Sequence, residues 1–152
     1  MKLYFLRHGK ADWPNWKKPD DERPLTREGE KEVRKVAKLL LRLDVGPLIL
    51  TSPLPRARET AVIASEILDR ELREETSLRP GFNASKLAGL LENISTKSLM
   101  LVGHEPDFSD TIAELTNGEI KISKAGVALV QLDPSTMKGR LRWLLPPEIA
   151  LL

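Results

Sequence analysis

The stretch Leu3-Tyr4-Phe5-Leu6-Arg7-His8-Gly9 starts with four apolar residues and ends in an arginine, a histidine and a glycine. A short apolar run bounded in this way is typical of a buried strand whose carboxyl end carries polar groups. The pattern returns at Leu48-Ile49-Leu50-Thr51, which Ser52 follows, and at Leu99-Met100-Leu101-Val102, which Gly103-His104 follows. We therefore expect three buried strands that all end in polar residues.

Segments with helical spacing separate these strands. Thr26 can cap a helix in which apolar residues recur every three or four positions after Val33, and Gly46-Pro47 is expected to end it. Further helices are expected at three places: from Arg56, over 85–91, and from Asp107 to a stop at Asn117-Gly118. Strands that alternate with helices indicate an α/β domain with a largely parallel sheet.

The end of the chain has a different pattern. Residues 125–132 and 140–145 are predicted to be strands around a turn at 133–139, which makes a C-terminal antiparallel hairpin. A short strand near Leu72 is a further possibility in the poorly patterned segment 70–82. The hairpin would make the mainly parallel sheet a mixed one.

Length and composition narrow the class of protein. The 152 residues, 41% hydrophobic and 30% charged, fit a single globular domain over 1–152. The absence of cysteine excludes disulfides, cysteine-ligated metals and thiolate catalysis. A net charge of +2 does not favour nucleic-acid binding. Neither a membrane-length apolar run nor a signal peptide is recognisable, so we expect a cytoplasmic protein that does not bind membranes.

The three strand ends carry the residues that are best suited to catalysis and ligand binding. Ligands of open α/β sheets bind at the carboxyl ends of the strands, where Arg7-His8-Gly9, Arg56 and His104 are expected to meet. Arginine matches phosphate oxygens with a planar fork of donors, a helix N-terminus adds backbone donors, and a neutral histidine can act as a nucleophile. Gly9 would permit close backbone approach. The cluster therefore predicts a phosphoryl site.

Two alternatives compete with this interpretation. Arg56 and Arg58 can simply pair with Glu59 or Glu66 on a helix surface, the commoner fate of helical arginines. A two-histidine, one-carboxylate set of ligands for a divalent metal could also be formed by His8, Asp12 and His104. Arg7 and Arg56 beside it would repel a dication, so we expect neither a metal nor a cofactor.

Four motifs follow one another along the chain: Arg7-His8-Gly9, Arg23-Pro24-Leu25-Thr26-x-x-Gly29, Ser52-Pro53-x-x-Arg56-Ala57-x-x-Thr60 and Gly103-His104-Glu105-Pro106. In this order and spacing they resemble the histidine phosphatase superfamily, and most closely its SixA-type phosphohistidine phosphatases. The resemblance extends from Met1 to about Leu145. This resemblance implies a three-layer α/β/α fold without an inserted cap.

The resemblance also implies a mechanism. His8 would attack phosphorus and become transiently phosphorylated, while Arg7, Arg56 and His104 hold the phosphoryl oxygens. Water would then hydrolyse the phosphohistidine, with no metal involved. A phosphorylated protein or a small phosphorylated molecule is the expected partner.

The sequence departs from the family pattern at the position of the general acid. Larger members have a glutamate after the middle strand, and Ser77-Leu78-Arg79-Pro80 does not supply one. Asp12, Glu105 and Asp107 are the candidates that remain. An imidazole leaving group has a pKa of about 6.5, far below that of water or an alcohol, and so needs less acid assistance than an alcohol. This favours phosphohistidine in a protein, such as a phosphotransfer domain, as the substrate. The alternatives are a small-molecule phosphomonoesterase and a phosphoprotein-binding module with little turnover.

The polar loop from Lys10 to Glu22 contains two of the three tryptophans, Trp13 and Trp16. Aromatic residues among charges indicate either a contact surface for a protein partner or rings that pin the loop to the domain. Lys124, before the hairpin, either reaches a phosphate or is solvated. The sequence leaves both questions open.

Overall fold

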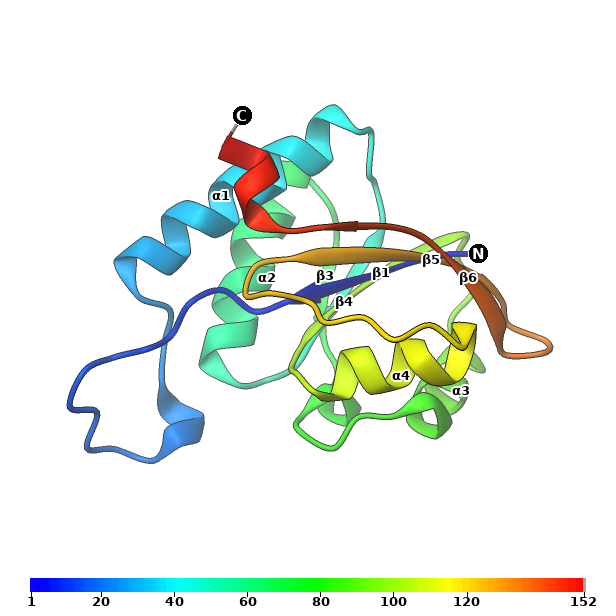
Figure 1. The fold of residues 1–152 in the computed structure, drawn as a ribbon, viewed down its shortest axis with the longest axis horizontal. Helices are drawn as coiled ribbons and strands as arrows, with labels where there is room; N and C mark the ends of the chain where they lie inside the picture. Colours follow the sequence, from blue (N-terminus) through cyan, green and yellow to red (C-terminus); the bar gives the residue numbers. More distant parts are fainter. Residues whose placement is uncertain (152) are drawn as a thin grey trace.

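A six-stranded sheet organises the chain, with strand order β3-β2-β4-β1-β5-β6 (Figure 1). The computed structural model describes residues 1–151. The strands are β1 Lys2–Arg7, β2 Leu48–Thr51, β3 Leu72–Glu74, β4 Ser98–Gly103, β5 Val127–Asp133 and β6 Lys138–Leu145. The first four are parallel to their neighbours in this group, while β5 pairs antiparallel with both β1 and β6. The predicted mixed, mainly parallel sheet with a C-terminal antiparallel hairpin is confirmed.

The helices form a layer on each face of this sheet. They are α1 Arg27–Arg42, α2 Pro55–Leu68, α3 Ala84–Leu91 and α4 Asp107–Thr116, with 3₁₀ turns η1 Asp20–Glu22, η2 Thr76–Leu78 and η3 Pro147–Leu151. Figure 1 shows α1 and α2 on one side of the sheet and α3 and α4 on the other. The three-layer α/β/α architecture is therefore confirmed.

Strand β1 lies at the centre because both of its faces are apolar. Tyr4 and Leu6 pack in the cluster shared with α1 and α2, while Leu3 and Phe5 pack in the cluster shared with α3 and α4. A strand buried on both faces has a continuous apolar sequence instead of an alternating one. The opening run of the chain has this pattern for that reason.

Several element boundaries differ from those expected. Helix α1 ends at Arg42, before Gly46-Pro47, because Asp44 adopts a left-handed conformation with φ of 57°. Strand β5 begins at Val127 because Ala125 is also left-handed, with φ of 60°. The segment 70–82 contains the short edge strand β3 followed by η2. No helix within residues 1–151 has the length and apolar character that crossing a bilayer requires.

Candidate active site

Strand register brings the polar strand ends to one level. Arg7 of β1 lies opposite Gly103 of β4, and Thr51 of β2 lies opposite Val102. The backbone N–H of His8 then donates to the carbonyl of Gly103 at 3.0 Å. The residues that directly follow these three adjacent parallel strands therefore lie at the same edge of the sheet; they are His8, Ser52 and His104.

A cavity of about 520 Å³ lies at this edge. Arg7, His8, Arg56 and His104 all line it, so the structure brings together the four side chains that the sequence placed at the strand ends. The other lining residues are Asp12, Asp20, Asp21, Arg23, Pro80, Glu105, Pro106, Asp107 and Lys124. Pro80 stands in the segment where larger family members have a glutamate.

His8 is held in one tautomer. Its Nδ1 lies 2.8 Å from the carbonyl oxygen of Gly9. A carbonyl only accepts, so Nδ1 carries the proton and Nε2 keeps its lone pair. Burial lowers the pKa of His8 to about 4; the Gly9 hydrogen bond opposes the shift, and the charges of Arg56, Arg7 and Arg23 add to it. The ring is therefore neutral at pH 7, with Nε2 available as a nucleophile.

His104 is held by Ser52. Its Nε2 lies 2.8 Å from Ser52 Oγ, which also accepts the backbone N–H of Leu54 at 3.2 Å. The hydroxyl can donate its proton to Nε2, in which case the ring proton lies on Nδ1. Burial lowers the pKa of His104 to about 3, and protonation of His8 together with the charges of Arg56 and Arg7 would lower it further. Nδ1 is buried and has no hydrogen-bond partner in the described part of the chain.

The two arginines keep donors free. Arg7 Nη1 donates to the carbonyl of Ile122 at 2.9 Å, which fixes the guanidinium. Arg56 is 7% exposed and donates from Nη1 to the carbonyl of Asp20 at 3.2 Å. Among residues 1–151 the buried Nε atoms of both arginines have no hydrogen-bond partner. Burial lowers the pKa of Arg56, as expected for a cation removed from water.

Among the described residues, neither helical arginine forms the pair with Glu59 or Glu66 that was the alternative. Arg58 is exposed and forms a surface ion pair with Glu74 of β3 at 3.4 Å. Arg56, two residues earlier on α2, turns inward and lies 3.8 Å from the carboxylate of Asp20. Arg56 is thus a component of the cavity.

Arg23 also lines the cavity, although no sequence pattern other than its family motif pointed to this residue. Its Nη1 donates to the carbonyl of Ala11 at 2.6 Å, and its Nε lies 2.8 Å from Oδ1 of Asp20. These contacts fold the loop between β1 and α1 back onto itself. The arginine in the Arg23-Pro24-Leu25-Thr26 motif was the signal for this residue.

The three candidate acids line the cavity, but each is engaged elsewhere. Asp12 forms an ion pair with Lys124, whose hydrogen bond holds the pKa of Asp12 below its usual range. The Glu105 carboxylate accepts the backbone N–H of Ser109 at 2.8 Å and so caps the first turn of α4. The Asp107 carboxylate accepts the backbone N–H of Gly81 at 2.8 Å. The structure gives none of them the geometry of a free proton donor.

Gly9 serves packing instead of lining the cavity. Its backbone N–H donates to Thr60 Oγ1 at 3.0 Å, and Thr60 in turn donates to the carbonyl of Arg56 at 2.8 Å. A Cβ at Gly9 would lie 2.6 Å from Val33 Cγ2. The glycine therefore permits close contact between the end of β1 and helix α1, and its N–H links His8 to the helix that carries Arg56.

The alternative metal set is not assembled. Within the described 151 residues, no three histidine, aspartate or glutamate side chains gather where they could hold a metal ion. Asp12, the carboxylate of that set, faces Lys124 and lies 3.8 Å from Arg23. Two cations thus surround the carboxylate that a dication would need.

The two tryptophans fasten the loop that borders the cavity. Trp13 Nε1 donates to the carbonyl of Pro24 at 2.8 Å, and Trp16 Nε1 donates to that of Pro19 at 3.0 Å. The ring centroids lie 6.4 Å apart, and Trp13 remains 40% exposed. Both acceptors lie within the loop between β1 and α1, so these hydrogen bonds brace the loop internally, and Trp13 also presents exposed surface. Lys124 reaches the cavity wall in its ion pair with Asp12.

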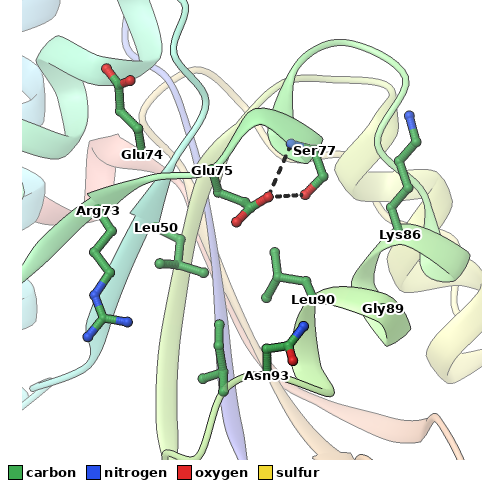
Figure 2. Close-up of a pocket in the computed structure, with 10 residues that line it drawn as sticks. Leu50, Arg73, Glu74, Glu75, Ser77, Lys86, Gly89, Leu90 and Asn93 are labelled. Atoms are coloured by element: carbon green, nitrogen blue, oxygen red, sulfur yellow. Dashed lines mark hydrogen bonds between the residues drawn. The ribbon is translucent and has the colours of Figure 1, made fainter.

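A second hollow of about 500 Å³ lies between β3 and α3 (Figure 2). Its wall includes Leu50, Arg73, Ser77 and Lys86 and contains no histidine. Figure 2 shows Glu75 accepting hydrogen bonds from Ser77, so this carboxylate is engaged within the wall. Nucleophilic chemistry is therefore concentrated at the sheet edge.

Comparisons with known proteins find matches at the level of the family and of the fold. The model described as histidine phosphatase superfamily, branch 1, matches residues 3–98. An uncharacterised protein of Picosynechococcus sp. is 34% identical over 140 residues, 84% of this chain and 82% of that protein.

Solved structures match over almost the whole chain. The protein histidine phosphatase SixA complexed with tungstate is 27% identical with a TM-score of 0.86, covering 98% of this chain and 99% of that one. The phosphoserine phosphatase of Entamoeba histolytica in complex with 3-phosphoglyceric acid has a TM-score of 0.77 and covers 99% of both chains, but at 17% identity it shows the fold alone.

Proposed function

Because this chain belongs to the histidine phosphatase superfamily, we propose that it hydrolyses phosphohistidine in a protein through a covalent intermediate on His8. The observation that carries the proposal is the state of His8. Its Nδ1 proton is fixed by Gly9, its Nε2 is unprotonated, and it lines a cavity with two partly unpaired arginines. A nucleophile and the donors for a phosphoryl group are thereby gathered in one place.

In the first step, His8 Nε2 attacks phosphorus and the bond from phosphorus to the leaving nitrogen breaks. Arg7, Arg56 and the Nδ1 proton of His104 bind the equatorial oxygens, where negative charge accumulates. In this proposal Ser52 acts through His104, because its hydroxyl donates to Nε2 and so favours the tautomer that presents the Nδ1 proton. The Gly9 carbonyl stabilises the cationic ring that forms when Nε2 becomes bonded.

The leaving group explains why the reaction can proceed although the carboxylates of the cavity are all bound to other residues. A phosphorylated imidazole protonated on its free nitrogen departs as neutral imidazole, so no acid is needed at the breaking bond. An alkoxide leaving group would need one, because its pKa is far higher. Asp12, Glu105 and Asp107 all have other partners, which supports a phosphoramidate substrate over an alkyl phosphate.

In the second step, water attacks the phosphoryl group on His8. The bond between phosphorus and Nε2 breaks, the water proton passes to the phosphate, and His8 is regenerated with its Nδ1 proton in place. No step uses a metal, so we propose that the reaction is metal-independent. A phosphorylated protein domain is the proposed partner, since the cavity lies at the sheet edge beside a surface tryptophan, Trp13.

The test compares two substrates in the presence of EDTA. Wild type and His8→Ala are incubated with a histidine-phosphorylated protein and with an aryl phosphate, and phosphate release is followed. We expect release from the phosphorylated protein by wild type only. Faster release from the aryl phosphate would favour the small-molecule phosphomonoesterase, which is the alternative function for this site.

The remaining outcomes are also informative. Binding of the phosphorylated protein without any release would indicate the phosphoprotein-binding module. Loss of release in EDTA, restored by added metal, would contradict the metal-independent mechanism. Equal release by wild type and His8→Ala would exclude His8 as the nucleophile.

A further inference from the structure

Asp20 lies among the cations that the proposed function assigns to the phosphoryl group. Its carboxylate Oδ1 is 2.8 Å from Arg23 Nε, and its Oδ2 is 3.8 Å from Arg56 Nη2. The carbonyl of Asp20 accepts a hydrogen bond from Arg56 Nη1 at 3.2 Å. Asp20 thus contacts Arg56 through both its backbone and its side chain, from the 3₁₀ turn η1 that lies far from Arg56 in the sequence.

The two contacts differ in kind. The carbonyl contact is a hydrogen bond that a neutral backbone group can keep when an anion binds. The carboxylate at 3.8 Å is beyond hydrogen-bond distance from Arg56, so its contribution is charge neutralisation. A phosphoryl oxygen within hydrogen-bond reach of the same guanidinium would interact more strongly.

A bound phosphoryl group and an ionised Asp20 would repel one another. Both would lie in the same cavity and face the same buried arginine, which is 7% exposed and therefore poorly screened by water. The Asp20 side chain is 70% exposed, so it can turn to solvent without disturbing packing. Its carboxylate is the mobile partner, and Arg56 is the fixed one.

We propose that the Asp20 carboxylate is an internal competitor for the phosphoryl group. It neutralises Arg56 and Arg23 when the cavity is free, leaves them when a phosphoryl group enters, and returns as phosphate departs. The inference rests on the proposed function, because it takes Arg56 as a phosphoryl ligand. Its consequence is weaker binding of free phosphate, which favours product release.

Asp20→Asn tests this competition, with Asp21→Asn as the matched control. Asp21 lines the same cavity and carries the same charge, but no ion pair joins it to Arg56 or Arg23 in the described part of the chain. Tungstate, a stable phosphate mimic, is titrated into each protein by calorimetry. We expect Asp20→Asn to lower the dissociation constant about fivefold, the scale of a partly screened ion pair, and Asp21→Asn to lower it by less than twofold.

Three results would overturn the proposal. If Asp20→Asn weakens tungstate binding, Asp20 positions Arg56 and does not compete. If it leaves binding unchanged, the carboxylate is irrelevant to the anion. If both variants tighten binding equally, the effect is general electrostatics.

Tryptophan fluorescence gives a second readout that a change in overall stability would not mimic. Trp16 bonds to the carbonyl of Pro19, next to Asp20, and Trp143→Phe removes the emission of the tryptophan on β6. In that background, tungstate should change the emission when Asp20 is present and change it less in Asp20→Asn. Equal changes would contradict displacement of Asp20.

The calorimetry also separates this inference from the proposed function. If wild type fails to bind tungstate, or binds it equally well when Arg56 is replaced by alanine, the phosphoryl site itself is wrong and both fall. If wild type binds it through Arg56 but Asp20→Asn is not tighter, only the competition is wrong.

Discussion

Two of the hollows of this protein have similar volumes, about 520 Å³ at the sheet edge and about 500 Å³ between β3 and α3, but differ in how their polar groups are paired. At the sheet edge, the buried nitrogens Arg7 Nε, Arg56 Nε and His104 Nδ1 have no hydrogen-bond partner among residues 1–151. Buried donors without partners are costly, and an arriving anion would satisfy them.

In the second hollow, the charges are paired with neighbours at the surface. Arg73 lies 2.8 Å from Glu71, with both side chains more than half exposed, and Lys86 donates to the carbonyl of Gly81 at 3.2 Å. Among residues 1–151, no buried side-chain nitrogen or oxygen of this wall, which Figure 2 shows, lacks a hydrogen-bond partner. The comparison teaches that the state of the donors, and not the size of the hollow, identifies the anion site.

The largest expected effect is the difference in activity between two variants, each of which loses one arginine from one of the hollows. Arg56→Ala should lower kcat/KM about 100- to 1000-fold, as removal of a donor to a transferring group does in other enzymes. Arg73→Ala, which removes an exposed surface pair, should change kcat/KM by less than about twofold. Steady-state phosphate release measures both, and comparable losses in the two variants would break the distinction between the hollows.

The pH dependence of stability sharpens the comparison, because both histidines belong to one hollow. Burial lowers the pKa of His8 to about 4 and that of His104 to about 3, against 6.5 when unfolded. Between these values the unfolded chain binds more protons, so the histidines contribute stability that is present above pH 6.5 and lost as the pH falls. Urea unfolding should show a decrease of roughly 2–4 kcal/mol from pH 7.5 to pH 5.

A control variant tests whether the two histidines cause this loss of stability. The double variant His8→Asn, His104→Asn should lose most of the dependence between pH 7.5 and pH 5. If it retains the wild-type dependence, the histidines are not neutralised by burial and the electrostatic description of the site is wrong.

The smallest expected effect is the difference in unfolding free energy between two serine-to-alanine variants. Ser52→Ala removes the buried partner of His104 and should cost about 1–3 kcal/mol of unfolding free energy. Ser77→Ala removes a surface hydrogen bond to Glu75 and should cost less than about 0.5 kcal/mol. Thermal unfolding of both variants checks this order, and the reverse order would contradict the view that the sheet edge stores the buried polar network.

The sequence was sufficient to predict which side chains meet at the sheet edge. Parallel strands end at one edge, so the residues after the runs at β1 and β4 had to lie together, whatever the details of packing. Arg56 followed from its place just after β2 and near the start of the next helix. Local apolar runs and the polarity of their ends carry this information, which is why His8 and His104 were correctly brought together.

The partners of those side chains could not be predicted in the same way. Arg23 and Asp20 lie in the loop between β1 and α1, which is shaped by contacts such as Arg23 to the Ala11 carbonyl and Trp16 to the Pro19 carbonyl. No periodic pattern specifies such contacts. The role of Ser52 likewise depends on the register of β2 against β4, which sets the distance to His104.

The central claim is that His8 carries the phosphoryl group during turnover, and rapid-quench mass spectrometry tests it most directly. Wild type mixed with a histidine-phosphorylated protein and quenched in alkali should show one acid-labile phosphoryl adduct on the peptide that contains His8, formed and lost at the rate of turnover. His8→Asn should show neither adduct nor phosphate release. An adduct on His104, or turnover by wild type with no adduct at any time point, would contradict the account.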